Sequence, residues 1–398
     1  MDVVNCTILL FLDYPDIINA CKGVPDFFRI GNKPYFWALK AEYDFGIPSS
    51  ELLLVPGTNN KKRYEFIYNI KDSNSGLIKV AKLGVLSLVK YFLNHGINLH
   101  LKKALRLSAG NGHIHIVKHL IEQGVDLHAE NESALRSAAW HGHLDIVKYL
   151  IEQGANLHII DEYPLRLAAW HGHLDVVKYL VEQGANLHAD NEDALLSAAW
   201  YGHFKVGKYL VEQGANLHNR NEIALRYAAS NNHLDVVKYL IEQGADLHVE
   251  DEYALKWSSG CGHFDVVKYL VEQGADFHAM DEEPLRWASI NGRLNVVKYL
   301  VEQGADFHIR DEEPLGQAAW YGHLDVVKYL VELGANLHIR DEEPLRYASN
   351  NGHLRIVKYL VEQGADPHAK NNEALRWAVE KRHTEIIKYL EQRADPFS

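Results

Sequence analysis

The clearest pattern along the chain is an apolar stripe with helical spacing, which one segment shows well. Four apolar residues recur at intervals that place them on one face of a helix: Leu144, Val147, Leu150 and Ile151. Asp145 suits the positive N-terminal end of such a helix, and Gly154 suits the position beyond its C-terminus. The pattern predicts an amphipathic helix that buries one face.

A shorter helix is predicted immediately before it. Leu135, Ala138 and Ala139 are again at helical spacing, and the small alanines allow a neighbouring helix to approach closely. Gly142 is expected to end this helix in the left-handed conformation that glycine adopts easily. We expect the short segment after Gly154 to connect units rather than to form a strand.

This pair of helices repeats along most of the chain. An Ala-Leu or Pro-Leu dipeptide returns every 30 residues, at positions 104, 134, 164, 194, 224, 254, 284, 314, 344 and 374. An earlier unit has the corresponding glycine at Gly96, and its spacing to Gly124 shows that the connection after it is two residues shorter. We therefore predict eleven related units between about Leu77 and Asp395.

Such helix pairs cannot cover their apolar faces alone, so neighbouring units have to supply the core. The predicted fold class is an all-α solenoid of helix-turn-helix units over residues 76–398. The last unit lacks the glycine before Ala394, and charged residues replace its usual loop and helix start: Glu380, Lys381, Arg382 and Glu385. We predict that this unit is a polar C-terminal cap.

The recurring frame resembles the ankyrin repeat: A/P-L-R-x-A-A/S-x-x-G-H-x-x-V-V-K-Y-L-V-E-Q-G-A-D/N. The sequence of the repeat is especially similar to that of ankyrin proteins from giant amoeba-infecting DNA viruses. The resemblance implies a stack of repeats whose concave face binds other proteins.

The frame departs from the ankyrin pattern in its length and in two positions. The family repeat usually has about 33 residues and opens its first helix with Thr-Pro-Leu-His. Here the hairpin is three residues shorter, and residues such as Glu283 and Arg286 stand at the Thr and His positions, so the family's projecting fingers and Thr–His hydrogen bonds do not carry over directly. Proline still occupies the first helical position in four units, where it is well tolerated: Pro164, Pro284, Pro314 and Pro344.

The histidines follow the repeat. Of 24 histidines, ten precede the connection between units and nine occupy the Gly-His position after the first helix or its equivalent. Catalytic and metal sites need different residue types that converge on one point, whereas these columns place identical residues one repeat apart. We predict structural roles, no catalytic residues, no metal and no cofactor; Arg293, which replaces one histidine, fits a hydrogen bonder near a helix end. A histidine-dependent metalloenzyme remains the third alternative.

Variable positions on the first helices are the candidates for partner binding. The residues concerned are Trp140, His141, Trp170, His171, Trp200, Tyr201, Trp320 and Tyr321. One interpretation places them on the concave face as interface anchors, with the main patch in the first three of these units. The other treats the rings as filler between neighbouring first helices, because an aromatic occurs at one of two positions in nearly every unit but never at both.

Composition narrows the class of partner. The net charge is −12 and no basic block interrupts it, which disfavours nucleic acid. Three scattered cysteines do not form a disulfide framework. Neither a signal peptide nor a membrane-spanning stretch is recognisable, so we expect no membrane contact and an intracellular location in the host cytoplasm.

The head of the chain, Met1 to Ser75, does not follow the repeat. Residues 1–45 are predicted to form a compact helical module, and residues 46–75 a connector. The module resembles an F-box through the spacing of Ile8, Leu12, Asp13, Asp16, Ile17, Phe27 and Trp37. The resemblance implies docking on a Skp-type adaptor through exposed apolar residues: Leu9, Leu12, Pro15, Ile17 and Trp37. The alternative is a plain N-terminal cap for the repeats.

Together these features favour a non-enzymatic protein–protein interaction protein. The leading hypothesis is a substrate-recruiting subunit of a host Skp-cullin-F-box ubiquitin ligase. The alternative is an ankyrin scaffold that binds or sequesters a host protein without any link to ubiquitin ligation.

Overall fold

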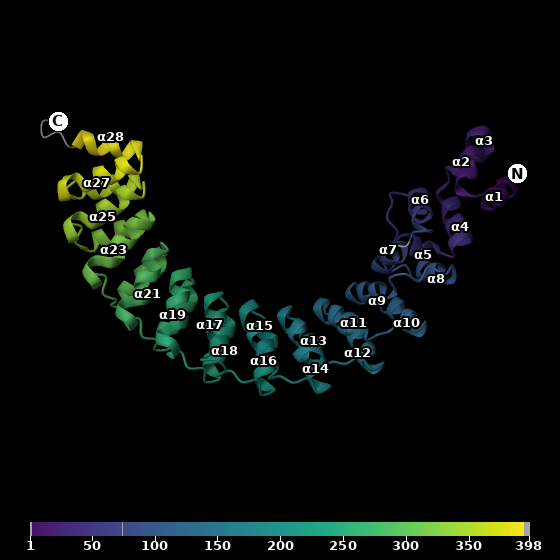
Figure 1. The fold of residues 1–398 in the computed structure, drawn as a ribbon, viewed down its shortest axis with the longest axis horizontal. Coiled ribbons are helices and arrows are strands. Elements are labelled where there is room, and N and C mark those ends of the chain that lie inside the picture. Colours follow the sequence, from purple (N-terminus) through teal and green to yellow (C-terminus); the bar gives the residue numbers. More distant parts are fainter. Residues whose placement is uncertain (1, 74, 394–398) are drawn as a thin grey trace. The chain divides into compact units, whose positions relative to one another are not determined.

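The computed structural model describes residues 2–73 and 75–393, and within these residues it contains helices and no strand. The chain divides into two compact units, Met1–Asp190 and Asn191–Ser398. Both contain stacked helix pairs, which the first unit adds to six preceding helices (Figure 1). The all-α prediction is confirmed; Ala394 and the rest of the predicted cap beyond Arg393 lie outside the described residues.

The first unit begins with six helices that precede the repeats. They are α1 Asp2–Leu10, α2 Tyr14–Gly23, α3 Pro25–Gly31, α4 Pro34–Phe45, α5 Ser49–Leu52 and α6 Asn60–Ile70. Four helix pairs follow: α7 Gly76–Leu83 with α8 Leu86–Asn94, α9 Leu101–Gly110 with α10 Ile114–Glu122, α11 Ala129–His141 with α12 Leu144–Glu152, and α13 Ile159–Trp170 with α14 Leu174–Glu182.

The second unit consists of seven helix pairs among its described residues. They are α15 Asp193–Tyr201 with α16 Phe204–Glu212, α17 Ile223–Ser230 with α18 Leu234–Glu242, α19 Val249–Cys261 with α20 Phe264–Glu272, α21 Ala279–Ile290 with α22 Leu294–Glu302, α23 Ile309–Tyr321 with α24 Leu324–Glu332, α25 Ile339–Asn350 with α26 Leu354–Glu362, and α27 Ala369–Glu380 with α28 Thr384–Arg393.

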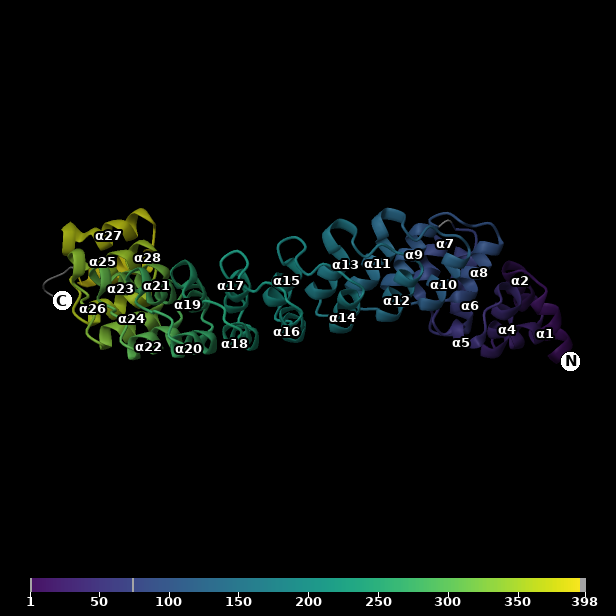
Figure 2. The same cartoon turned by 90° about the horizontal axis from the view of Figure 1, so that it is seen from below.

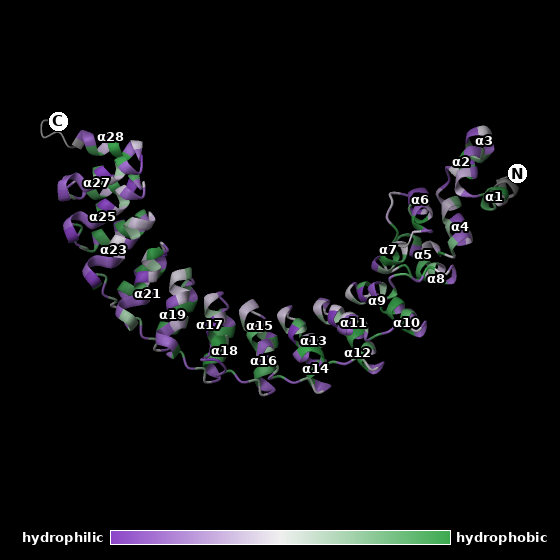
Figure 3. Ribbon diagram, viewed as in Figure 1, coloured by the Kyte–Doolittle hydropathy of each residue, from purple (hydrophilic) through white to green (hydrophobic). Residues whose placement is uncertain are grey.

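Within each unit the first helices of successive repeats pack on one another, and the second helices form a parallel layer (Figure 2). Leu135 and Ala138 of α11 and Val147 of α12 are fully buried between these layers. Hydrophobic colour in Figure 3 accordingly follows the second helices and the faces they turn towards the first helices. The core between two neighbouring repeats is therefore built from apolar side chains of both repeats.

The predicted helix boundaries are confirmed at both glycines. Gly142 follows α11 with a φ of 77°, and Gly154 follows α12 with a φ of 96°, both left-handed. The prediction of a shorter first helix does not hold in every repeat: α17 spans 8 residues against 9 in α18, whereas α11 spans 13 against 9 in α12. In one repeat both α15 and α16 span 9 residues, because the first helix begins directly after the connection.

The connection between repeats contains a feature that was not predicted. Three consecutive residues, Glu130, Asn131 and Glu132, have φ values of 54°, 54° and 55°. This single left-handed turn recurs in the following repeats and leads directly into the right-handed first helix. Non-glycine residues rarely adopt this conformation, so contacts in the folded repeats have to hold the turn in place.

The head of the chain corrects one expectation. Leu9, Ile17 and Trp37, predicted to be exposed, are buried, and Trp37 is only 2% exposed. The indole Nε1 of Trp37 donates to the carbonyl of Gly31 at 2.6 Å. A module this small has few residues with which to build a core, so the large apolar side chains are needed inside it. Of the predicted contacts, Pro15 is exposed and Leu12 is half-buried.

The segment 46–75 contains α5 and α6, and α6 packs against α4. Tyr64 of α6 is buried and donates its hydroxyl hydrogen to Asp44, which also forms an ion pair with the buried Lys40 at 2.6 Å. Burial and this hydrogen bond raise the pKa of Tyr64 well above its ordinary value. In the part of the chain that the structure describes, no helix has both the length and the apolar character needed to cross a membrane.

Candidate functional site

The Gly-His positions join neighbouring repeats. His143 donates from Nε2 to the carbonyl of Gly110, 3.1 Å away at the end of the preceding first helix. His173 makes the same bond to Trp140 at 2.9 Å, and His353 to Trp320 at 2.9 Å. A side chain on Gly142 would come within 2.5 Å of the His173 ring, so the glycine supplies space as well as a left-handed turn.

Arg293 shows that the Gly-His position needs a hydrogen-bond donor rather than a histidine. It occupies the histidine position of its repeat, and its Nε donates to the carbonyl of Gly260 at 3.0 Å. The predicted role of a hydrogen bonder near a helix end is therefore confirmed, because a different donor fulfils it in the same place. Among the described residues no group of three or more histidine, cysteine, aspartate or glutamate side chains is placed to hold a metal ion.

The other histidine column has a partner that sequence reasoning missed. His128 Nδ1 donates to Glu132 Oε1 at 2.6 Å, and Glu132 is only 3% exposed. The same carboxylate accepts the backbone N–H of Asn156 in the next repeat at 3.2 Å. Glu132 closes the left-handed turn, so this hydrogen-bond network accounts for the unusual backbone. The recurrence of glutamate four residues after histidine, at the same period of 30, was the available signal.

The pKa values of His128 and His248 are shifted in the opposite direction to that of His263. The hydrogen bond to Glu132 raises the pKa of His128, and the bond to Glu252 raises that of His248. Burial instead lowers the pKa of His263, which belongs to the Gly-His column. The surroundings of His128 and His248 therefore favour the charged imidazole, and those of His263 favour the neutral imidazole.

The predicted partner-binding residues lie on the first helices, and most keep exposed surface. In the first unit Trp140 is 40% exposed and Trp170 is 41% exposed. The Trp140 ring centre lies 4.2 Å from that of His171, which directly follows α13. His141 is exposed and donates from Nδ1 to the carbonyl of Ser137 at 2.9 Å.

The second unit shows the same arrangement. Trp200 packs edge-on against Tyr227 with ring centres 4.7 Å apart, and Trp320 packs in the same way against Tyr347 at 4.8 Å. Tyr201 and Tyr321 are exposed. The rings thus fill space between neighbouring first helices, as one interpretation had predicted, while the exposed edges remain accessible to a partner.

A hollow of about 270 Å³ opens beside Trp140 in the first unit. Its walls come from α9, α11 and α13: Arg106, Ser133, Arg136, Ser137, Trp140, His141, Tyr163 and Leu167. Two of the predicted residues, Trp140 and His141, therefore contribute to this hollow. The arginines were not predicted, because each occupies a position of the frame where arginine recurs in most repeats.

Comparison with known proteins agrees with the geometry of the stacked helix pairs. The family model described as ankyrin repeats (3 copies) matches residues 77–161, 158–221, 225–311, 277–341 and 315–397. No curated protein matches the chain. Ankyrin repeats mediate protein–protein binding, and proteins built from them are typically scaffolds without enzymatic activity. With more than half of its length matched by this model, the chain belongs to the ankyrin-repeat family.

Proposed function

We propose that this protein recruits a host protein to a ubiquitin ligase: the repeats hold the target, and the head docks on a Skp-type adaptor. The observation that carries the recruiting role is the set of exposed aromatic residues on stacked first helices, with Trp140 and Trp170 in the first unit. Tryptophan gives a large contact area at low entropic cost, which suits an interface anchor. That the target is a host protein is proposed because the repeat sequence resembles ankyrin proteins of amoeba-infecting viruses.

The proposed adaptor contact involves different residues from those the F-box pattern suggested. Leu9, Ile17 and Trp37 form the core of the head, but Ile8 and Phe11 remain exposed beside Pro15. Further exposed apolar residues lie on α4 at four-residue intervals: Tyr35, Leu39 and Tyr43. Phe11, which directly follows α1, meets Tyr43 edge-on with ring centres 5.4 Å apart, and α1 itself contacts α4, so the two helices share one apolar surface. We call it the α1–α4 surface.

The test is co-purification of a Skp-type adaptor with the full-length protein. Phe11→Asp with Leu39→Asp should abolish co-purification, because charge is introduced at two exposed positions of the α1–α4 surface. Leu333→Asp is the matched control, since Leu333 has the same 44% exposure as Leu39 but lies in the second unit. Failure of the unaltered protein to bind the adaptor would overturn the ligase role and leave a scaffold that sequesters its target.

A further inference from the structure

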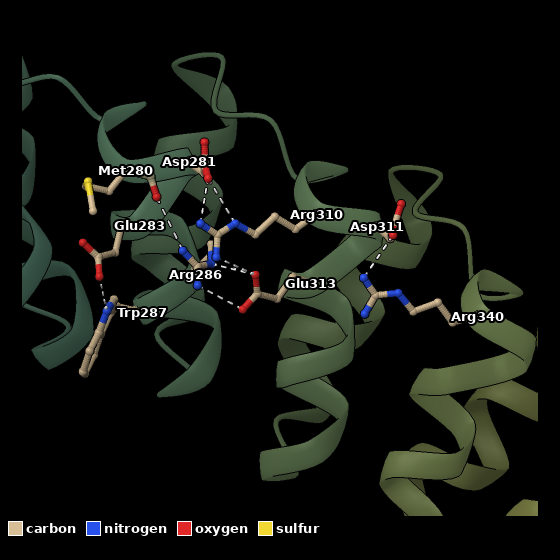
Figure 4. Close-up of polar contacts among 9 residues, drawn as sticks. All are labelled: Met280, Asp281, Glu283, Arg286, Trp287, Arg310, Asp311, Glu313 and Arg340. Atoms are coloured by element: carbon tan, nitrogen blue, oxygen red, sulfur yellow. Dashed lines mark hydrogen bonds and ion pairs between the residues drawn. The ribbon is translucent and has the colours of Figure 1, made fainter.

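One column of cations runs through the first helices, and four members in the second unit face a carboxylate of the following repeat: Arg226, Lys256, Arg286 and Arg346. The cation follows the leucine of the Ala-Leu or Pro-Leu dipeptide. Arg286 Nε lies 2.9 Å from Glu313 Oε2, and Lys256 Nζ lies 3.3 Å from Glu283 Oε2. Figure 4 shows the Arg286–Glu313 pair between α21 and α23.

These acids occur at two positions of the following repeat. The first position directly precedes the dipeptide, and its acids are Glu283, Glu313 and Glu373, the last of which pairs with Arg346. The second position lies one helical turn earlier, where Glu250 Oε2 lies 3.0 Å from Nη1 of Arg226. A half-buried guanidinium thus obtains a carboxylate from one of the two positions.

Arg136 has neither acid. The position before the next dipeptide is occupied by Tyr163, and the earlier position by Ile160. The guanidinium of Arg136 lies 5.7 Å from the Tyr163 ring centre, and Nη2 donates to the carbonyl of Glu130 at 2.8 Å. Within residues 2–73 and 75–393, Arg136 makes no ion pair with a carboxylate.

Arg106, on the other wall of the same hollow, is only weakly paired. Ser133 occupies the position before the next dipeptide, and Glu130 at the earlier position supplies a carboxylate 4.0 Å from Nε. This distance is beyond hydrogen bonding, and both side chains are well exposed. The hollow therefore combines two arginines with two serine hydroxyls and no carboxylate among its lining residues.

We propose that this hollow binds the carboxylate side chain of an acidic peptide segment in the protein target. The carboxylate of the target supplies the acidic partner that Glu313 supplies to Arg286, and it enters the hollow beside Tyr163, where it accepts charge-assisted hydrogen bonds from Arg136 and Arg106. Trp140, at the rim, packs against the neighbouring part of the peptide. The proposal rests on the protein-binding part of the proposed function and not on the adaptor contact.

The size of the hollow favours a side chain over a whole small molecule. Ordinary ligand pockets enclose roughly 300–1,000 Å³, whereas this hollow holds about 270 Å³ and opens beside an exposed tryptophan. The frame also accommodates a carboxylate here, because glutamate occupies the Ser133 position in later repeats, at Glu283 and Glu313.

The probe is a phage-displayed library of random 12-residue peptides selected on the full-length protein. Selected peptides should share one Asp or Glu position. A fluorescein-labelled peptide with that residue should bind at least about tenfold more tightly than its Glu→Gln version. Loss of Arg136 in Arg136→Gln should weaken binding by a similar factor.

Two matched variants separate binding from folding. Ser133→Glu places an internal acid beside Arg106, as in the second unit, and should abolish peptide binding without lowering the thermal midpoint. Arg286→Gln removes an arginine that already has a partner and should leave peptide binding unchanged.

Selected peptides without a common acid, or unchanged binding in Ser133→Glu, would overturn the proposal. A third version of the labelled peptide carries phosphoserine at the shared position. Tight binding of this version but not of the version with glutamate would also overturn the proposal, in favour of a phosphate ligand. Loss of adaptor binding with intact acidic-peptide binding would remove only the ligase role.

Discussion

The repeat at α11 and the repeat at α21 have the same helical frame but differ in what meets their arginine. Arg286 of α21 pairs with Glu313 at 2.9 Å, whereas Arg136 of α11 faces Tyr163 and no carboxylate among the described residues. Both repeats retain the left-handed turn and the buried glutamate, Glu132 in one and Glu282 in the other. The residues common to all repeats therefore maintain the fold in both. The variable positions decide whether the arginine of the first helix has a carboxylate partner.

The largest expected effect lies in the shared frame. Gly142→Ala should destabilise the protein by about 2–4 kcal/mol, because a side chain in the left-handed conformation is strained and would displace His173 from its hydrogen bond. Gly322→Ala should have a similar cost, since His353 lies equally close. Urea unfolding of the full-length protein measures both.

Gly154→Ala is the control for these glycine variants. Gly154 is also left-handed, but no atom lies within 4 Å of the added carbon. Its cost should be limited to the backbone, about 1–2 kcal/mol. Equal losses for Gly142→Ala and Gly154→Ala would show that the histidine contact does not matter.

The buried glutamates come next. Glu132→Ala should cost about 1–3 kcal/mol, because it leaves His128 and the N–H of Asn156 without their acceptor. Glu312→Ala should cost the same in the second unit, where Glu312 accepts from His308 and Asn336. Thermal melting measures both variants, with Glu130→Ala as the control because Glu130 is exposed. An equal shift of the melting midpoint in all three variants would contradict a structural role for the buried glutamates.

The pH dependence of stability distinguishes His248 from His263. The pKa of His248 is raised in the folded state, so its stabilising contribution is complete below the ordinary value of about 6.5 and is lost as pH rises through the folded pKa. The pKa of His263 is lowered, so its contribution is present above about 6.5 and is lost as pH falls.

Urea midpoints at pH 5.5 and pH 8.5 test this opposition. His248→Gln should lose more stability at the lower pH and His263→Gln more at the higher. The same pH trend in both variants would contradict the assignment of different charge states.

Substitution of exposed and of packed tryptophans separates a role in partner binding from a role in packing. Trp140→Ala with Trp170→Ala should weaken target binding while far-UV helicity persists, because about two-fifths of each ring is exposed. Trp257→Ala is the comparison, since Trp257 packs on Trp287 with ring centres 5.2 Å apart and is less exposed. It should lower the melting midpoint more and affect binding less. Global unfolding of the Trp140/Trp170 variant would favour the filler interpretation.

The smallest expected effect concerns the arginine itself. A double-mutant cycle with Arg286→Gln and Glu313→Gln should give a coupling of roughly 0.5–1 kcal/mol, because the pair is only partly buried. Tyr163→Glu should stabilise the first unit by a similar amount by giving Arg136 a partner. A coupling near zero between Arg136 and the new glutamate would remove the parallel between the two repeats.

The sequence by itself determined the repeat, its period, the all-α class and the glycine-terminated helices. These features depend on local spacing and on backbone conformation, and Leu144 or Gly142 reports them directly. The structural role of the Gly-His column was also predictable, because Arg293 substitutes within it.

Tertiary structure alone decided which side chains remain free. Trp37 entered the core of the head because a small module needs its large rings inside. The left-handed turn at Glu132 depends on an acceptor that reaches the next repeat, which no local propensity reports. Arg136 looks like every other arginine of the frame, and only the residues that face it across the repeat boundary show that its charge has no acidic partner within the described chain. Contacts between repeats, rather than the spacing within one, therefore determine the candidate site.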